Sequence, residues 1–143
     1  GPERMPQPTL ADIDALLGRD RDLPVDLVVD EAIGELPHSV MLTGYRVVQE
    51  ALTNVRRHAG PVERVEVRVR RDDDRLAIAI TDDGRGAAAD DVGPGYGIVG
   101  MRERIAAMGG DINVGPRIGG GWQVQFSIPV EQHVATRPRE TTA

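Results

Sequence analysis

The stretch HSVMLTGYRVVQEALTNVRRHAG, residues 38–60, carries the clearest structural pattern of the chain. Apolar residues recur in it at steps of four and three, the period of a helix with one buried face. They are Met41, Tyr45, Val48, Leu52, Val55 and Ala59. Gly60-Pro61 follows and cannot continue a helix. The sequence therefore predicts a long amphipathic helix from about His38 to Ala59.

Around this helix, period-two alternation predicts strands. Residues 64–70 and 76–80 read as one antiparallel hairpin, residues 111–114 and 122–128 as a second, and residues 24–29 as a further strand. A second helix is predicted from Ile98 to Met108, and a short one is predicted after Thr9. We expect an α+β two-layer sandwich, in which helices cover one face of a mixed, largely antiparallel sheet.

Composition limits the function classes. The chain has 143 residues, 40% of them hydrophobic, no cysteine and a net charge of −6. This fits one globular domain and excludes a disulfide scaffold or a thiolate site. The acidic balance and the scarcity of aromatic residues argue against nucleic acid as the main partner. No apolar run is long enough to span a membrane.

The two ends differ from the middle. Gly1-Pro2 resembles a protease-cleavage scar, so we expect a chain cut from a longer one, with residues 1–8 a disordered N-terminus. We assign residues 9–130 to a single domain. Residues 131–143 lose all hydrophobic pattern and are expected to form a disordered tail.

Glu50 and Asn54 lie one helical turn apart, so they share a face, which we expect to point away from the apolar stripe. Considered alone, the pair indicates a solvent-exposed polar face of the helix. A carboxylate and an amide oxygen at this spacing can also hold a hydrated Mg²⁺. Arg57 and His58 follow, where they can contact phosphates or simply favour the helix C-terminus.

A second cluster, Asp82-x-Gly84-x-Gly86, directly follows a predicted strand. It can be an ordinary acidic turn. Alternatively, the carboxylate can accept a hydrogen bond from an exocyclic amine such as that of adenine, while the glycines let the backbone pass close to a flat ring.

A third cluster, Gly95-x-Gly97-x-x-Gly100, precedes the second helix. Glycines there can direct backbone N–H groups at an anion. The cluster does not follow a strand of a βαβ unit, so it is no dinucleotide fingerprint, and the chain has no P-loop motif.

The three clusters, in this order, resemble the N, G1 and G2 boxes of the GHKL ATP-binding superfamily. VQEALTNVRRHA, residues 48–59, and GIVGMRERI, residues 97–105, resemble the sensor histidine kinases that pair with NarL-type response regulators. The resemblance covers about residues 23–130.

The resemblance implies a role for each matching position. Asn54 would bind Mg²⁺ and phosphates, and Glu50 would act as a base or in the metal shell; these two are the expected catalytic and metal residues. Asp82 would accept from the adenine amine. The other expected ATP-binding residues are Arg57 and His58 near the phosphates, Gly84 and Gly86 at the base, and Gly95, Tyr96, Gly97 and Ile98 at the hinge of a lid.

The implied function is that of a catalytic domain that binds Mg-ATP and gives its γ-phosphate to a histidine on a separate dimerisation domain. None of the three histidines of this chain is followed by an acidic residue as in the family's acceptor motif, so we expect no autophosphorylation by the chain alone. The expected partners are that dimerisation domain and a NarL-type response regulator, with no nucleic acid and no membrane contact. We expect a cytoplasmic domain, whatever the topology of its parent.

Two alternatives remain open at this point. An anti-sigma-factor-type serine kinase shares the fold, although the segment Met101–Arg104 argues against it. A docking module that no longer binds nucleotide is the other. Trp122 is expected to serve strand packing first.

Overall fold

The computed structural model describes residues 23–30, 33–84 and 97–131 of the chain. Five strands form one sheet in the order β1-β2-β3-β5-β4. The strands are β1 (Val25–Val29), β2 (Val65–Asp72), β3 (Arg75–Asp82), β4 (Asp111–Pro116) and β5 (Trp122–Pro129), and the helices are α2 (His38–His58) and α3 (Ile98–Ala107). The short helix predicted after Thr9 lies outside the described residues.

The sheet is mixed, as predicted. β1 runs parallel to β2, whereas β2–β3, β3–β5 and β5–β4 are antiparallel pairs. The β2–β3 hairpin turns through Asp73 and Asp74, and Asp73 has φ 58, a left-handed value that aspartate tolerates better than most residues. Both predicted hairpins are therefore confirmed.

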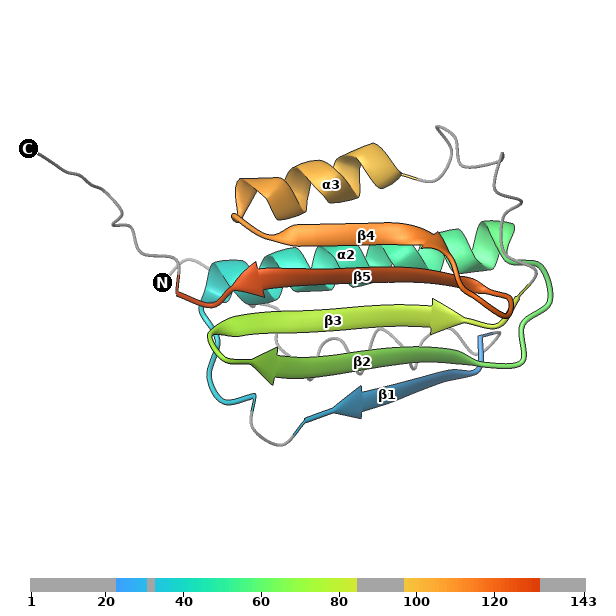
Figure 1. Ribbon diagram of the computed structural model, residues 1–143, viewed down its shortest axis with the longest axis horizontal. Coiled ribbons are helices and arrows are strands. Elements are labelled where there is room, and N and C mark those ends of the chain that lie inside the picture. Colours follow the sequence, from blue (N-terminus) through green and yellow to red (C-terminus); the bar gives the residue numbers. More distant parts are fainter. Residues whose placement is uncertain (1–22, 31–32, 85–96, 132–143) are drawn as a thin grey trace, which may run out of the picture.

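One face of the sheet is buried, because alternate residues of β2, β3 and β5 are buried and the residues between them are not. The helices cover that face: α2 packs on β3 and β5, and α3 packs on β4 and β5 (Figure 1). The fully buried side chains include Val47, Val48, Val65, Val67, Leu76, Ile78, Ile105, Phe126 and Ile128. This is the predicted two-layer α+β arrangement.

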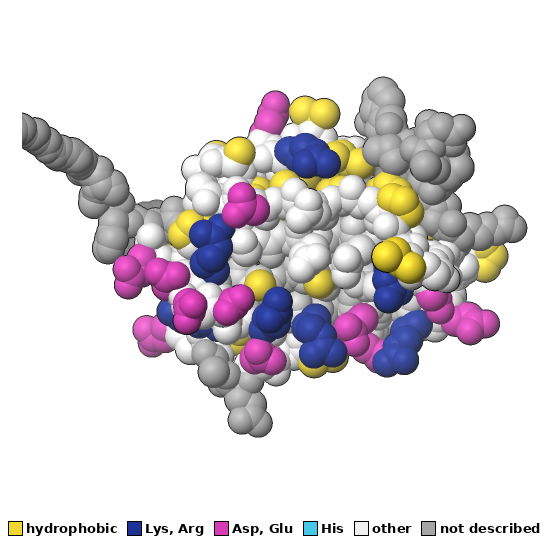
Figure 2. Space-filling model, in the orientation of Figure 1, with side chains coloured by type: hydrophobic (Ala, Val, Ile, Leu, Met, Phe, Trp, Pro, Cys, Tyr) yellow, Lys and Arg dark blue, Asp and Glu magenta, His cyan; other side chains and the backbone are white. Residues whose placement is uncertain are grey.

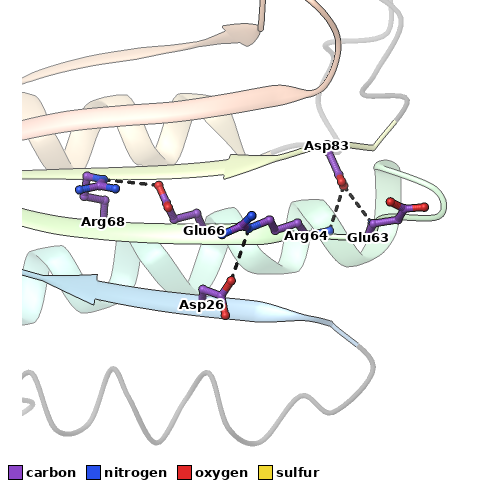
Figure 3. Close-up of polar contacts among 6 residues, drawn as sticks. All are labelled: Asp26, Glu63, Arg64, Glu66, Arg68 and Asp83. Atoms are coloured by element: carbon purple, nitrogen blue, oxygen red, sulfur yellow. Dashed lines mark hydrogen bonds and ion pairs between the residues drawn. The ribbon is translucent and has the colours of Figure 1, made fainter.

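None of the described helices covers the other face of the sheet. Figure 2 shows charged side chains of both signs interspersed along its lower part and mostly uncharged groups over its centre. Two of the ion pairs there are Arg64–Asp26 and Arg68–Glu66, each at 3.4 Å (Figure 3). Such exposed pairs contribute little to stability.

The start of α2 is tied to the far end of the β2–β3 hairpin. Nη1 of Arg71 donates to the carbonyl oxygen of Ile33 at 2.8 Å. Since α2 has 21 residues, it extends about 30 Å from this point. The C-terminal half of α2 is thereby brought to the opposite end of the sheet, where β3 ends and β5 begins (Figure 1).

Candidate nucleotide-binding site

Asp82 is the last residue of β3 and a buried carboxylate. It continues the buried positions Leu76, Ile78 and Ile80 along the helix-covered face and is only 2% exposed. The backbone N–H of Gly84 donates to its Oδ1 at 2.8 Å. The strand therefore positions a hydrogen-bond acceptor at the edge of the hydrophobic core. This burial distinguishes Asp82 from the carboxylate of an ordinary acidic turn, which would be solvated.

Burial raises the pKa of the Asp82 carboxyl, because removal from water disfavours the charged form. The hydrogen bond from Gly84 lowers this pKa, the negative charge of Asp83 raises it, and the positive charge of Arg117 lowers it. The net shift is upward. Buried carboxylates with a raised pKa are frequent at functional sites.

Asp83, the next residue, faces the other way. Its Oδ1 accepts the backbone N–H groups of Glu63 at 2.9 Å and Arg64 at 3.1 Å, next to the uncovered face (Figure 3). Asp83 is exposed. The two neighbouring carboxylates thus have separate roles, and Asp83 holds the connection before β2.

Gly84 brings the chain against the end of α2. A Cβ at this position would lie 2.6 Å from the carbonyl oxygen of Ala59 and 2.9 Å from Cγ1 of Val62. Only glycine permits this approach. Gly86, the second glycine of the predicted cluster, lies outside the described residues.

The prediction that Asn54 points away from the apolar stripe of α2 is wrong. Asn54 is 4% exposed, so it lies at the margin of the buried stripe and does not point away from it. Its side-chain oxygen Oδ1 is buried and accepts no hydrogen bond from the residues that the structure describes, although other interactions involve Asn54. Glu50 is half-buried one turn earlier, Arg57 is exposed, and His58 is half-buried.

Glu50 contacts the start of α3. Gly97, which precedes the first helical residue Ile98, has φ 65, and a Cβ on it would lie 2.8 Å from Cδ of Glu50. Gly97 is therefore required both for its backbone conformation and for space. The structure thus brings together two predicted site residues that are 47 positions apart in the sequence. Ile98 is half-buried beside them.

The remaining predicted site residues, Gly95 and Tyr96, lie outside the described residues. Those that are described come from four segments: the C-terminal half of α2, the end of β3, Gly84, and the start of α3. Figure 1 shows the end of α2, the end of β3 and the start of α3 towards the same end of the molecule.

The turn between β4 and β5 also reaches this end, although none of the expected site residues lies on it. A Cβ on Gly121 would clash with the carbonyl oxygen of Asp82, and Trp122 is the register partner of Asp82 in the sheet. The sequence signal for this turn is the run Gly119-Gly120-Gly121. In the structure all three glycines have positive φ. Trp122 is 6% exposed and belongs to the core, as its packing role predicted.

Two hollows in the described part of the chain lie apart from α2. One, of about 310 Å³, is lined by outer-face residues such as Arg68, Arg70 and Gln125. The other, of about 200 Å³, is lined by Arg64, Glu66, Thr81, Asp82, Asp83 and Arg117. Neither is lined by Glu50 or Asn54, whereas Asp82 lines the second.

No group of three or more His, Cys, Asp or Glu side chains that could hold a metal ion occurs within residues 23–30, 33–84 and 97–131. The same residues contain no helix long and apolar enough to cross a membrane.

Comparison with known proteins identifies the family. Residues 42–132 match the profile of the histidine kinase-, DNA gyrase B- and HSP90-like ATPases. The signal transduction histidine-protein kinase/phosphatase UhpB of Salmonella typhimurium is 35% identical over 105 residues, which are 73% of this chain and 20% of UhpB. The sensor histidine kinase YxjM of Bacillus subtilis is 35% identical over 94 residues, 66% of this chain and 22% of YxjM.

Solved structures of histidine kinases have a similar fold. The Erythrobacter litoralis EL346 blue-light activated histidine kinase is similar with a TM-score of 0.71 at 25% identity, over 86% of this chain and 41% of that one. The histidine kinase domain of the E. coli osmosensor EnvZ shares the fold, with a TM-score of 0.65 at 18% identity, over 100% of this chain and 99% of that domain. This chain spans about a fifth of its curated relatives. It belongs to the histidine kinase-, DNA gyrase B- and HSP90-like ATPase family and is an ATPase domain of the histidine kinase type.

Proposed function

We propose that this chain is the ATP-binding half of a two-component sensor histidine kinase, which binds Mg-ATP and donates the γ-phosphate to a histidine on a separate dimerisation domain. The observation that carries the proposal is the buried Asp82 carboxylate at the end of β3, with Gly84 against it. It occurs in a chain whose relatives are named histidine kinases. The domain is proposed to extend over residues 9–130.

Asp82 is proposed to recognise the base. Its Oδ1 already accepts the Gly84 N–H, so the carboxylate is held in place before any ligand arrives. An acidic acceptor favours a base that offers an exocyclic amine, as adenine does, and disfavours one that offers a carbonyl oxygen there. Gly84 and Gly86 are proposed to pass close to the ring, and Gly95, Tyr96, Gly97 and Ile98 to lie at the hinge of a lid.

Asn54 and Glu50 are proposed to hold Mg²⁺. They supply an amide oxygen and a carboxylate one turn apart on α2, and hard cations take such oxygen ligands. The ion would neutralise phosphate charge, which a chain of net charge −6 needs if it is to hold a polyanion. Arg57 and His58, in the last turn of α2, are proposed to contact the phosphates.

The residues of this chain would contribute to transfer mainly by positioning. Phosphoryl transfer needs an in-line arrangement and neutralisation of charge, and little covalent participation by the protein. Glu50 is proposed to accept the proton of the attacking histidine or to orient the metal shell. The partners proposed are the dimerisation domain that bears this histidine and, downstream, a NarL-type response regulator. We place the domain in the cytoplasm.

Calorimetric titration with ADP and ATP, with and without Mg²⁺, tests the proposal. Asp82→Asn places an amide N–H₂ or a neutral oxygen where the carboxylate accepts, so we expect affinity to fall about 10- to 100-fold. Asp83→Asn is the matched control, because it changes the adjacent carboxylate that faces the outer side, and we expect affinity within about twofold of the unmodified chain. Absence of nucleotide binding by the unmodified chain would overturn the proposal.

A further inference from the structure

The outer face of the sheet, which none of the described helices covers, carries a hollow of about 310 Å³. Ala77 and Ala79 of β3 form its floor. They alternate with the buried residues Leu76, Ile78 and Ile80 and therefore project outward. Because β3 is the middle strand of the five, two short side chains there leave a depression between the longer side chains of the neighbouring strands.

Two successive rungs of the sheet have the same pattern across this hollow. In each, an arginine of β2 lies opposite an alanine of β3, which lies opposite an uncharged polar residue of β5. The rungs are Arg68–Ala79–Gln125 and Arg70–Ala77–Ser127. Opposite residues of paired strands project to the same side of a sheet. The two rungs thus define a trough along β3, the alanine trough, with guanidinium groups on one side and uncharged polar groups on the other.

The positive charge of the alanine trough is on its β2 side. Arg70 is exposed and forms no ion pair with a carboxylate in the part of the chain that the structure describes. Arg68 pairs with Glu66 at 3.4 Å, and both side chains are partly exposed. Such a pair contributes little to stability, so another carboxylate can replace Glu66 at small cost. Both guanidinium groups are therefore available to an acidic ligand.

The two acidic side chains that line the hollow lie at its other borders. Asp111, on the edge strand β4, pairs with Nη2 of Arg75 at 3.1 Å, and Nε of Arg75 donates to Oγ of Ser127 at 3.1 Å. Asp72, near the β2–β3 turn, is the register partner of Arg75. The acidic residues of the hollow are thus gathered around Arg75, and the β2 side keeps an excess of positive charge in a chain of net charge −6.

We propose that the alanine trough binds an extended acidic segment of a partner protein, in which two carboxylates lie two residues apart. Side chains at this spacing in an extended chain project to the same side, about 7 Å apart, as do those of Arg68 and Arg70. Each carboxylate would lie opposite one guanidinium group, which can donate two hydrogen bonds to it. The alanine floor leaves room for the backbone of the segment, and the Gln125 amide on the far side can both donate and accept.

This docking site is separate from the candidate nucleotide site. The alanine trough lies on the outer face of the sheet, whereas Glu50 and Asn54 belong to α2, which packs on the other face. The inference therefore does not rest on the proposed function, and its test requires no nucleotide.

Two short peptides of equal composition test the proposal. Acetyl-Thr-Asp-Thr-Asp-Thr-amide has its carboxylates two residues apart, whereas acetyl-Thr-Thr-Asp-Asp-Thr-amide has them adjacent, so that they project to opposite sides. In an NMR titration of the full chain, we expect the first peptide to shift the backbone amide resonances of Ala77 and Ala79 and to leave those of α2 unchanged. The second is expected to bind at least about threefold more weakly.

Substitutions on the outer face provide the second arm. Arg70→Gln removes one guanidinium group and is expected to weaken binding of the first peptide about three- to tenfold. Ala79→Leu fills the trough without a change of charge and is expected to abolish the shifts. Arg64→Gln is the matched control, because Arg64 is an exposed arginine of the same face that pairs with Asp26 and lines the other hollow. We expect it to leave the affinity unchanged, and thermal unfolding checks that each variant is folded.

Three results would overturn the proposal. The first is an absence of shifts at millimolar concentrations of the first peptide. The second is equal affinity for the two peptides, or an equal loss in Arg64→Gln and Arg70→Gln, since the attraction would then be one of charge without a shaped site. The third is self-association of the chain that Ala79→Leu abolishes, with no response to either peptide, which would assign the trough to a second copy of this chain.

Discussion

Among single residues, Asp82 is a proposed binding group whose burial is expected to lower the stability of the fold that carries it. Burial raises the pKa of its carboxyl above the ordinary value of 3.8, despite the hydrogen bond from Gly84. The folded chain then keeps the proton at pH values where the unfolded chain has lost it. The favourable contribution of protonated Asp82 to the free energy of unfolding is complete below the pKa that this carboxyl has in the unfolded chain. It is lost as the pH rises through the higher pKa of the folded chain.

Asp82→Asn removes this dependence, because an amide fills the same volume, accepts from Gly84 and carries no charge. We expect the ligand-free variant to have a larger free energy of unfolding than the unmodified chain at pH 7, and the difference to shrink as pH is lowered toward 4. Urea denaturation at both pH values measures it. A variant that is less stable at pH 7 would show that the carboxylate is better solvated than its burial indicates.

Among the helices, α3 depends on a glycine at its first turn. Gly97→Ala would force an L side chain into φ 65 and into the Glu50 carboxylate, so we expect a loss of about 1–2 kcal/mol in the free energy of unfolding and weaker nucleotide binding. Gly100→Ala is the matched control. It lies in the same helix with no atom within 4 Å of the added Cβ, and we expect a gain of about 0.5–1 kcal/mol.

Glu50→Ala separates the two causes of the Gly97 effect. In the double variant the steric conflict with the carboxylate is gone, and only the cost of the left-handed backbone remains. We expect the Gly97→Ala penalty to fall by about half in that background. Chemical denaturation of the four variants of this cycle provides the measurement, and an unchanged penalty would show that Glu50 moves aside at no cost.

The elements themselves were largely predictable from the sequence. Periodicity placed α2 at residues 38–59, and the structure has His38–His58; alternation placed both hairpins. Periodicity failed for Asn54, because it identifies a buried face by its apolar members. Asn54 is polar and lies at the margin of that face, where tertiary packing buries it. It equally failed for the approach of Gly121 to Asp82, since these residues are 39 positions apart and no local pattern predicts which strands pair.

In the molecule as a whole, the candidate site lies at one end of the sheet. The two described histidines, His38 and His58, lie at opposite ends of α2 and therefore at different distances from it. His38 begins α2 and Asn54 lies 16 residues later, about 24 Å along the helix axis, so His38 lies far from the site of its own chain. His58 lies at the C-terminal end of α2, near the proposed phosphate position, where it can contact phosphate but has no acidic residue after it.

We expect the isolated chain to bind Mg-ATP and to gain no acid-labile phosphate when it is incubated with labelled ATP. A separately produced dimerisation domain of the same parent kinase, added in trans, is expected to become labelled, and Asp82→Asn is expected to reduce that labelling at least as much as it reduces affinity. Label on the isolated chain would contradict the prediction. Mass-spectrometric mapping of the labelled residue would then show whether the acceptor is His58, the one histidine that the described fold places beside the candidate site, because His58→Gln alone would also remove a proposed phosphate contact.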